Sequence, residues 1–205
     1  MAVHPTAVIE PNVLIGRNTA IWDHVHVRHS TRIGDDCVIG GKTYIAYGVH
    51  IGDRVKINSF VYICTEVTIE RGVMISAGVV FTNDRFPRAT TPDLRHLLPS
   101  DPDEKTLPTL VREGATIGAH ATIGPGLTIG RFAMIGMGSV VTHDVPDHAV
   151  VRGNPARAFG YACTCGQTLT QIEFPYPATP ELRCKSCNSR YATDGSTIKS
   201  LVAIS

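Results

Sequence analysis

The sequence predicts an all-β fold built from many short and evenly spaced strands. Thirteen consecutive segments of six residues, from Ala7 to Asp84, carry an aliphatic or aromatic residue at the third position. The same period returns near Val111 and continues to Val141. An ordinary β-sandwich would not keep a strict six-residue period over such a length. We therefore expect one repetitive β-structure with a single long interruption.

Each six-residue segment is expected to form a short strand followed by a turn. The first and third positions share one face of an extended chain, and the second position points the other way. Glycine is frequent at the fourth position, where a turn can use backbone angles that other residues resist. The third-position residues, which should form the core, are Ile9, Ile15, Ile21, Val27, Ile33, Ile39, Ile45, Ile51, Ile57, Ile63, Ile69, Ile75, Phe81, Val111, Ile117, Ile123, Ile129, Ile135 and Val141.

The interruption, residues 85–110, is expected to be an inserted loop that leaves the repeat in register. Phe81 and Val111 are separated by five whole periods, so both fall on the third position. Loops of more than ~12–15 residues are usually functional or disordered. This one contains five prolines, and a stiffened loop on a rigid scaffold suits substrate recognition.

Composition and charge narrow the class of protein. The net charge of the 205 residues is +1, so no overall field favours a nucleic acid or an anionic membrane as partner. The N-terminal stretch "MAVHPTAVIEPN" lacks the pattern of a signal peptide, and no apolar run approaches the ~18 residues of a membrane span. We expect a soluble cytoplasmic protein in which cysteines are thiols or metal ligands.

A second, smaller unit is expected after residues 1–157. Cys163 and Cys165 form one close pair, and Cys184 and Cys187 form another. Four thiolates in two pairs make a closed tetrahedral zinc site of the structural kind. Two disulfides or a redox pair are the alternatives. We assign residues 158–192 to a zinc-ribbon-like unit that covers the last strand edge, and residues 193–205 to a tail.

The repeat from residue 7 to about 157 resembles the hexapeptide-repeat acyltransferases. The resemblance implies a left-handed parallel β-helix with three six-residue segments in each coil, and a homotrimer with active sites between subunits. Residues eighteen apart would then stack at about 4.8 Å. Asp84 would lie over Glu66, and Asn83 over Thr65, Tyr47 and His29.

Two stretches are similar to a narrower group, the sugar-nucleotide N-acetyltransferases that acetylate a 3-amino sugar. They are "VTIERGVMI", residues 67–75, and "TNDRFPRA", residues 82–89. The resemblance favours UDP-2-acetamido-3-amino-2,3-dideoxy-glucuronate as acceptor. The dTDP-3-amino-3,6-dideoxyhexoses are the alternative.

The same resemblance assigns roles to residues near the interruption. Asn83 and Asp84 would be catalytic, Asn83 by holding the amine and Asp84 by orienting it first and removing a proton second. Glu66, Arg85 and Arg88 would bind the substrate. The two arginines suit this role because guanidinium groups bind a diphosphate or a uronate carboxylate in bidentate fashion. Loop solubility is the alternative role of the two arginines. His96 is the reserve candidate for a base.

The stretches "GMGSVVTHDVP" and "VRGNPAR" are similar to the end of the β-helix in hexapeptide enzymes that use acetyl-CoA. The resemblance places the pantetheine arm beside small residues and the CoA phosphates beside basic ones. A simple turn that ends the β-helix is the alternative. The expected acetyl-CoA residues are Gly118, Gly136, Gly138, Arg152, Asn154 and Arg157.

The histidines of the repeat raise the alternative of a metal-dependent enzyme. Among His24, His26 and His29, the pair His24 and His29 superficially resembles two zinc ligands of the γ-class carbonic anhydrases, but no third ligand from a distant coil is in step. A non-catalytic scaffold whose loop and cysteine unit bind protein is another alternative. The remaining histidines of the repeat, His50, His120, His143 and His148, are expected at the surface or in turns.

Overall fold

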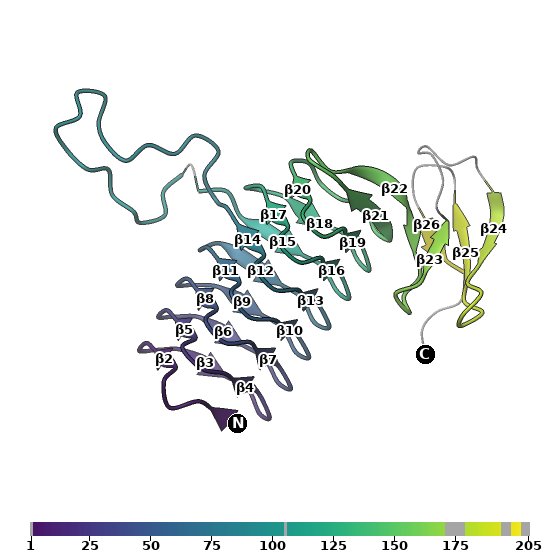
Figure 1. Cartoon of the computed structure of the whole chain (residues 1–205), viewed down its shortest axis with the longest axis horizontal. Helices are drawn as coiled ribbons and strands as arrows, with labels where there is room; N and C mark the ends of the chain where they lie inside the picture. Colours follow the sequence, from purple (N-terminus) through teal and green to yellow (C-terminus); the bar gives the residue numbers. More distant parts are fainter. Residues whose placement is uncertain (1, 105, 171–178, 194–197, 202–205) are drawn as a thin grey trace.

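The structure is a computed structural model that describes residues 2–104, 106–170, 179–193 and 198–201. Short strands stack into a parallel β-helix with three faces, and this confirms the fold class predicted from the six-residue period. A long excursion projects from one edge of the β-helix, and a small β-unit follows its last coil (Figure 1). Among the described residues, no helix has the length and apolar character needed to cross a membrane.

The three faces are named A, B and C here, in the order in which the chain visits them. Face A contains β1 (Ala2–Val3), β4 (Ala20–Ile21), β7 (Val38–Ile39), β10 (Lys56–Ile57), β13 (Met74–Ile75), β16 (Thr116–Ile117), β19 (Met134–Ile135), β21 (Ala149–Arg152), β22 (Arg157–Ala162) and β23 (Thr168–Thr170). Face B contains β2 (Val8–Ile9), β5 (His26–Val27), β8 (Tyr44–Ile45), β11 (Tyr62–Ile63), β14 (Val80–Phe81), β17 (Thr122–Ile123) and β20 (Val140–Val141). Face C contains β3 (Leu14–Ile15), β6 (Arg32–Ile33), β9 (His50–Ile51), β12 (Val67–Ile69), β15 (Thr109–Val111) and β18 (Thr128–Ile129).

The register of the strands sets one coil at 18 residues, as the sequence predicts. Tyr44 pairs with Tyr62, and Tyr62 pairs with Val80. The third-position side chains point inward, and Ile39 and Ile57 are completely enclosed. Those of the first coil, such as Ile9, are half-buried because no earlier coil covers them. The second-position side chains point outward, so each face presents a row of stacked side chains.

The turns use glycine for a reason other than the one expected. The left-handed backbone conformation falls on the sixth position of the segments, where Asn18, Lys42 and Phe60 have φ of 57°, 62° and 63°. Fourth-position glycines permit close stacking instead. A Cβ on Gly118 would lie 2.6 Å from the carbonyl oxygen of Ile135 in the next coil, well inside van der Waals contact.

The excursion leaves the B–C corner, the turn between faces B and C, and returns to it in register. Strand partners across it differ by 42 positions instead of 18, as in the pair Val80 and Thr122, so 24 residues are inserted. Ile69 pairs with Val111, as the preserved period predicts. The outer part folds back on itself through an antiparallel bridge between Thr90 and Leu97.

The chain changes direction after β21. Strand β22 runs antiparallel to β21, and β23 runs antiparallel to β22, so face A continues into the C-terminal unit. A separate three-stranded sheet contains β24 (Thr179–Arg183), β25 (Arg190–Thr193) and β26 (Ile198–Ser200). Strand β26 belongs to the range 193–205 expected as a tail. Residues 171–178 of the predicted unit, and 194–197 and 202–205 of the tail, lie outside the described residues.

Candidate functional site

The predicted acceptor residues lie at the B–C corner, where the excursion begins. Buried Phe81 ends β14, and the backbone N–H of Thr82 still donates to Ile123 in the following coil. Asn83 is half-buried, and its carbonyl accepts a 3.0 Å hydrogen bond from the N–H of Leu107. The two ends of the excursion therefore meet at Asn83. The register of β14 on β11 and of β11 on β8, continued into the turn, is the one from which Asn83 is expected over Thr65 and Tyr47.

Asp84 and Glu66 are both exposed, and each accepts a hydrogen bond from a backbone N–H. The carboxylate of Asp84 accepts a 2.7 Å hydrogen bond from the N–H of Phe86, which fixes the first turn of the excursion. The carbonyl of Glu66 accepts from the N–H of Thr109, where the excursion ends. Glu66 therefore lies beside the closing end of the excursion.

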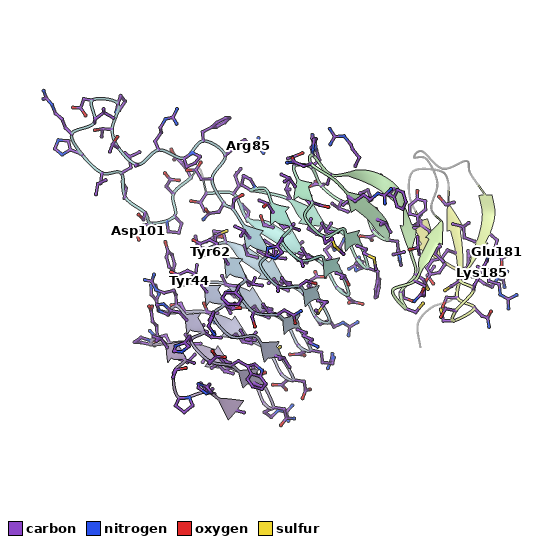
Figure 2. All side chains as sticks on the ribbon, viewed as in Figure 1. Tyr44, Tyr62, Arg85, Asp101, Glu181 and Lys185 are labelled. Atoms are coloured by element: carbon purple, nitrogen blue, oxygen red, sulfur yellow. The ribbon has the colours of Figure 1, made fainter. Side chains whose placement is uncertain are left out.

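Arg85 and Arg88 are exposed on the first turn of the excursion, and Figure 2 shows Arg85 at its base. His96 belongs to the folded outer part, where its carbonyl accepts from the N–H of Thr91. Figure 1 shows this outer part away from the β-helix. The two arginines therefore lie at the start of the excursion, a few residues after Asn83 in the sequence. The reserve base His96 lies on the distant part of the loop.

The excursion contacts the β-helix again two coils below Asn83. The hydroxyl of Tyr47 donates to the carbonyl of Ser100 at 3.3 Å, and burial raises the pKa of Tyr47, with the nearby Asp101 acting in the same direction. Tyr47 stacks in parallel on His29 with ring centroids 5.1 Å apart. The part of the excursion at Ser100 therefore lies beside the stacked pair of Tyr47 and His29, below the acceptor residues.

A half-buried ion pair supports this corner from below. Nε of Arg28 lies 2.6 Å from Oε1 of Glu10, and the Arg28 guanidinium beside the carboxylate lowers the pKa of Glu10 to about 2. The guanidinium of Arg28 also lies 5.7 Å from the ring centroid of Tyr47, within the range of a cation–π contact. The pair holds the Tyr47 ring from one side.

The glycines predicted to bind acetyl-CoA lie on a different edge, the A–B corner. Gly118, Gly136 and Arg152 stack in successive coils, and a Cβ on Gly136 would come within 2.9 Å of the Cβ of Arg152. Gly118 and Gly136 thus have a packing reason to be glycine. Gly138 differs, because a Cβ there would meet no atom within 4 Å, and the surface beside it is open.

Arg152 and Arg157 are directly paired across the hairpin of β21 and β22. Like charges placed opposite each other in a sheet repel, so a bound anion would relieve the pair. The guanidinium of Arg152 lies 3.4 Å from the ring centroid of Phe159. Arg157 also lines a hollow with Thr142 and His143 at the end of the β-helix. Asn154 lies exposed in the turn that joins the two strands.

Face B separates the two groups of predicted residues. Asn83 follows strand β14 of face B at the B–C corner, and Gly118 precedes face B at the A–B corner. A single chain therefore does not bring the acceptor residues and the three glycines together. Two edges of different chains can do so where they meet.

The four predicted zinc ligands form a compact cluster in the C-terminal unit. Their sulfur atoms lie within 4.8 Å of one another, with 3.4 Å between Cys163 and Cys187 and 3.6 Å between Cys165 and Cys184. All four cysteines are free, so the disulfide alternative is excluded for this structure. Zinc–sulfur bonds of ~2.3 Å in a tetrahedron place sulfur atoms about 3.8 Å apart, so the cluster fits such an ion. The hydroxyl of Ser189 lowers the pKa of Cys187 to about 6, which favours the thiolate.

The histidines of the carbonic anhydrase alternative do not converge. His24 lies at the A–B corner and His29 at the B–C corner, on opposite sides of face B, with His26 on the face between them. Within the described residues, the grouping whose donor atoms could hold a metal ion is the four-cysteine cluster. Within one chain, the three histidines therefore form no metal site among the described residues.

His148 lies in a turn, as expected, but its side chain is buried and only 7% of it is exposed. Its ring stacks on Phe132 of the preceding coil and contacts Tyr191 of β25 edge-on, and burial lowers its pKa. The C-terminal unit covers this corner. The six-residue period does not predict that contact, because the C-terminal unit lies outside the repeat. Tyr191, fully buried beside the cysteines, was missed for the same reason.

The parallel β-helix of six-residue segments defines the class of scaffold, and the comparisons identify its family. The family model "Bacterial transferase hexapeptide (six repeats)" matches residues 12–47 and 48–83, and "Hexapeptide repeat of succinyl-transferase" matches residues 108–143. A dTDP-3-amino-3,6-dideoxy-alpha-D-galactopyranose 3-N-acetyltransferase of Aneurinibacillus thermoaerophilus is 43% identical over 171 residues, 83% of each chain. The galactoside O-acetyltransferase of Escherichia coli strain K12 is 31% identical over 44% of this chain and 42% of its own.

A solved structure supports the fold. The polySia-specific acetyltransferase NeuO has a TM-score of 0.51 at 19% identity, over 77% of this chain and 85% of its own. The chain therefore belongs to the hexapeptide-repeat acyltransferases. The family resemblance seen in the sequence is confirmed, and with it the assignment as an enzyme.

Proposed function

We propose that the protein transfers the acetyl group of acetyl-CoA to the 3-amino group of a nucleotide-linked 3-amino sugar. The observation that carries this proposal is the 43% identity, over 83% of both chains, to an enzyme named for that reaction. The position of Asn83 at the base of a proline-rich excursion supports it, because a rigid corner with an adaptable loop suits a sugar nucleotide.

The reaction needs little from the protein beyond position and polarity. The amine nitrogen attacks the thioester carbonyl carbon, an amide bond forms, the carbon–sulfur bond breaks, and the proton lost by the nitrogen balances the CoA thiolate. Holding the two reactants in line supplies much of the rate in reactions of this kind. A base is not essential when the amine is partly neutral near pH 7.

The residues of the B–C corner take the acceptor side. The side-chain amide of Asn83 holds the amine, and Asp84 attracts it as ammonium from the first turn of the excursion. Glu66 borders the same space from the coil below. Arg85 and Arg88 bind the diphosphate, for which exposed guanidinium groups at the loop base are suited.

The dTDP-linked 3-amino-3,6-dideoxyhexoses are the favoured acceptors. The sequence motifs alone put UDP-2-acetamido-3-amino-2,3-dideoxy-glucuronate first and the dTDP sugars second. The relative at 43% identity favours the opposite order, because the substrate in its name is a dTDP-linked 3,6-dideoxy sugar. Such a sugar carries no uronate carboxylate, and this leaves the diphosphate as the partner of Arg85 and Arg88.

Acetyl-CoA is assigned to the A–B corner and the end of the β-helix. The pantetheine arm passes the open surface beside Gly138, along the column of Gly118 and Gly136. The paired guanidinium groups of Arg152 and Arg157, with Asn154 in the turn between them, bind the phosphates. The site is then shared between chains, because the acceptor and donor corners of one chain lie on opposite sides of face B.

A homotrimer would provide that sharing, and face B suits the contact. Its outward row includes Tyr44 and Tyr62, stacked with centroids 5.4 Å apart, and Val80, which is 38% exposed. Closed rotational symmetry lets each chain give one corner to each neighbour. Face B would be the surface buried between subunits.

The C-terminal cluster is assigned a structural zinc ion. Cys163, Cys165, Cys184 and Cys187 supply four thiolates and leave no open position for a substrate. The ion would tie β22, which continues face A, to the sheet of β24–β26.

The test is acetyl transfer to a panel of dTDP- and UDP-linked 3-amino sugars, with CoA release as the readout. The dTDP-3-amino-3,6-dideoxyhexoses should have the highest kcat/KM. Faster turnover of the UDP-linked uronate would reverse the nucleotide assignment. Transfer to galactosides but to no amino sugar would overturn the proposal.

A further inference from the structure

We propose that the four-cysteine unit positions the acetyl-CoA site, acting through Tyr191 and His148 on the hairpin that carries Arg152 and Arg157. The inference rests on the proposed function for the role of the two arginines and on the zinc assignment for the cluster. It makes Tyr191 a positioning residue, since its side chain reaches a metal ligand and no substrate.

The hairpin connects the two sites directly. Strand β22 begins at Arg157 and ends at Ala162, and Cys163 is the next residue. Arg152 faces Arg157 at one end of the hairpin, and Ala149 faces Tyr161 near the other. Six residues at ~3.4 Å each span about 20 Å, and the pairing with β21 has one irregularity, between Val150 and Val151. A shift at Cys163 is therefore carried along the strand to the arginine pair.

Tyr191 connects the cluster to the β-helix. Its hydroxyl oxygen accepts a 3.1 Å hydrogen bond from the N–H of Thr164 and lies 3.1 Å from the sulfur of Cys163. The hydroxyl also lies 3.2 Å from Oγ1 of Thr164. When both Thr164 groups donate to it, the Tyr191 hydroxyl proton is left for the sulfur, and a metal-bound thiolate accepts such bonds. The ring of Tyr191 meets the His148 ring edge-on at 5.3 Å.

His148 fixes the same end of the hairpin to the last coil. Its Nδ1 donates to the carbonyl of Ala162 at 2.9 Å, and the N–H of Ala162 donates back to the His148 carbonyl at 2.7 Å. The N–H of His148 donates to the carbonyl of Arg131, and its ring stacks on Phe132. The contacts thus run without a gap from the β-helix through His148 and Tyr191 to the metal ligand.

The anchoring of the hairpin matters for the pair of Arg152 and Arg157. Two guanidinium groups on directly paired residues repel each other, and the repulsion tends to open the end of the hairpin. Stacking of Arg152 on Phe159, two residues beyond Arg157, holds one of them. Anchoring the far end at Cys163, with His148 and Tyr191, keeps the register that presents both arginines together.

The decisive variant is Tyr191→Phe, which keeps the ring beside His148 and removes the hydroxyl. The matched control is Ser189→Ala, which also removes a hydroxyl 3.1 Å from a ligand sulfur, that of Cys187. Within the part of the unit that the structure describes, the backbone carbonyl of Ser189 accepts from the N–H of Cys184, and Ser189 has no bond to the hairpin. The readouts are zinc content, the Kd of acetyl-CoA by calorimetry, and hydrogen exchange of residues 149–162.

We expect Tyr191→Phe to retain zinc, to weaken acetyl-CoA binding by about two- to tenfold, as for one lost hydrogen bond, and to speed exchange in residues 149–162. The KM of the amino-sugar acceptor should not change. Ser189→Ala should change zinc affinity and leave acetyl-CoA binding alone. Unchanged exchange and unchanged acetyl-CoA binding in zinc-loaded Tyr191→Phe would overturn the inference.

A second measurement covers the case in which Tyr191→Phe does not fold. Zinc is removed from the wild-type protein with a chelator, and exchange is compared between residues 149–162 and the coils of residues 20–81. Faster exchange confined to the hairpin supports the coupling, and equal exchange rejects it. If the wild-type protein binds no acetyl-CoA, the proposed function fails, and the exchange data still test the coupling.

Discussion

Leu107 donates its backbone N–H to the carbonyl of Asn83, and this bond closes the excursion on the residue where it begins. The side chain of Asn83 therefore extends from a backbone that the returning chain holds directly, and the preceding residue, Thr82, is bonded to Ile123 of the following coil. Such a position is suited to holding a reacting amine, because small displacements of a reacting group are costly in rate.

Asn83→Ala should lower kcat by roughly one to three orders of magnitude, because the amine loses the group that orients it. The backbone bond to Leu107 remains, so the thermal unfolding midpoint should stay near that of the wild type. Steady-state kinetics and a thermal melt test this prediction. A near-normal kcat would move the chemistry away from this corner.

Asp84 has two separable roles, and two substitutions distinguish them. Asp84→Asn keeps an oxygen that can accept from the N–H of Phe86, and Asp84→Ala does not. If the charge matters, both variants raise the KM of the amine acceptor. If only the turn matters, Asp84→Asn should behave like the wild type and Asp84→Ala alone should be impaired. The KM of acetyl-CoA serves as the internal control.

Arg85→Ala or Arg88→Ala should raise the KM of the sugar nucleotide by roughly tenfold and leave that of acetyl-CoA unchanged, as for a lost charge-assisted hydrogen bond. Arg95→Ala is the matched control, because Arg95 is equally exposed but belongs to the outer part of the excursion. An equal effect of all three substitutions would assign the arginines to loop solubility.

Much of the β-helix could be read from the sequence, because one apolar residue in six determines both the core and the register. Ile69 and Val111 pair across the excursion as the period requires. The reason for glycine at the fourth position could not be read in this way. Gly118 is small because the next coil passes over it, and that contact depends on how coils stack in space.

The candidate site was predicted in part. The motif at Asn83 points to the B–C corner, and the cysteine spacing predicts the cluster that the structure shows. The separation of Asn83 from Gly118 by face B was not foreseen, since a motif does not tell which edge of a triangular coil it occupies. The burial of His148 was missed because its partners, Phe132 and Tyr191, are far away in the chain.

The cysteine cluster predicts about one tightly bound zinc ion per chain, measured by elemental analysis of the dialysed protein. Cys184→Ser should lose the ion and expose residues 160–192 to proteolysis, while the β-helix stays folded. Cys64→Ser is the control, because burial in the β-helix raises the pKa of Cys64 to about 12 and keeps it from the metal. A metal-free protein whose four thiols titrate freely would contradict the prediction.

The exposed aromatic side chains of face B predict that the protein is a trimer. Tyr62 is 44% exposed on this face and stacks on Tyr44, so a charge introduced there would be placed in the proposed contact between subunits (Figure 2). Tyr62→Glu should convert a trimer into monomers and abolish acetyl transfer, because the donor and acceptor corners then no longer meet. Thr68→Glu is the matched control, since Thr68 is the exposed second-position residue of a strand on face C. Light scattering gives the mass, and circular dichroism shows whether the β-helix is intact. A monomeric wild-type protein with full activity would refute both the trimer and the shared site.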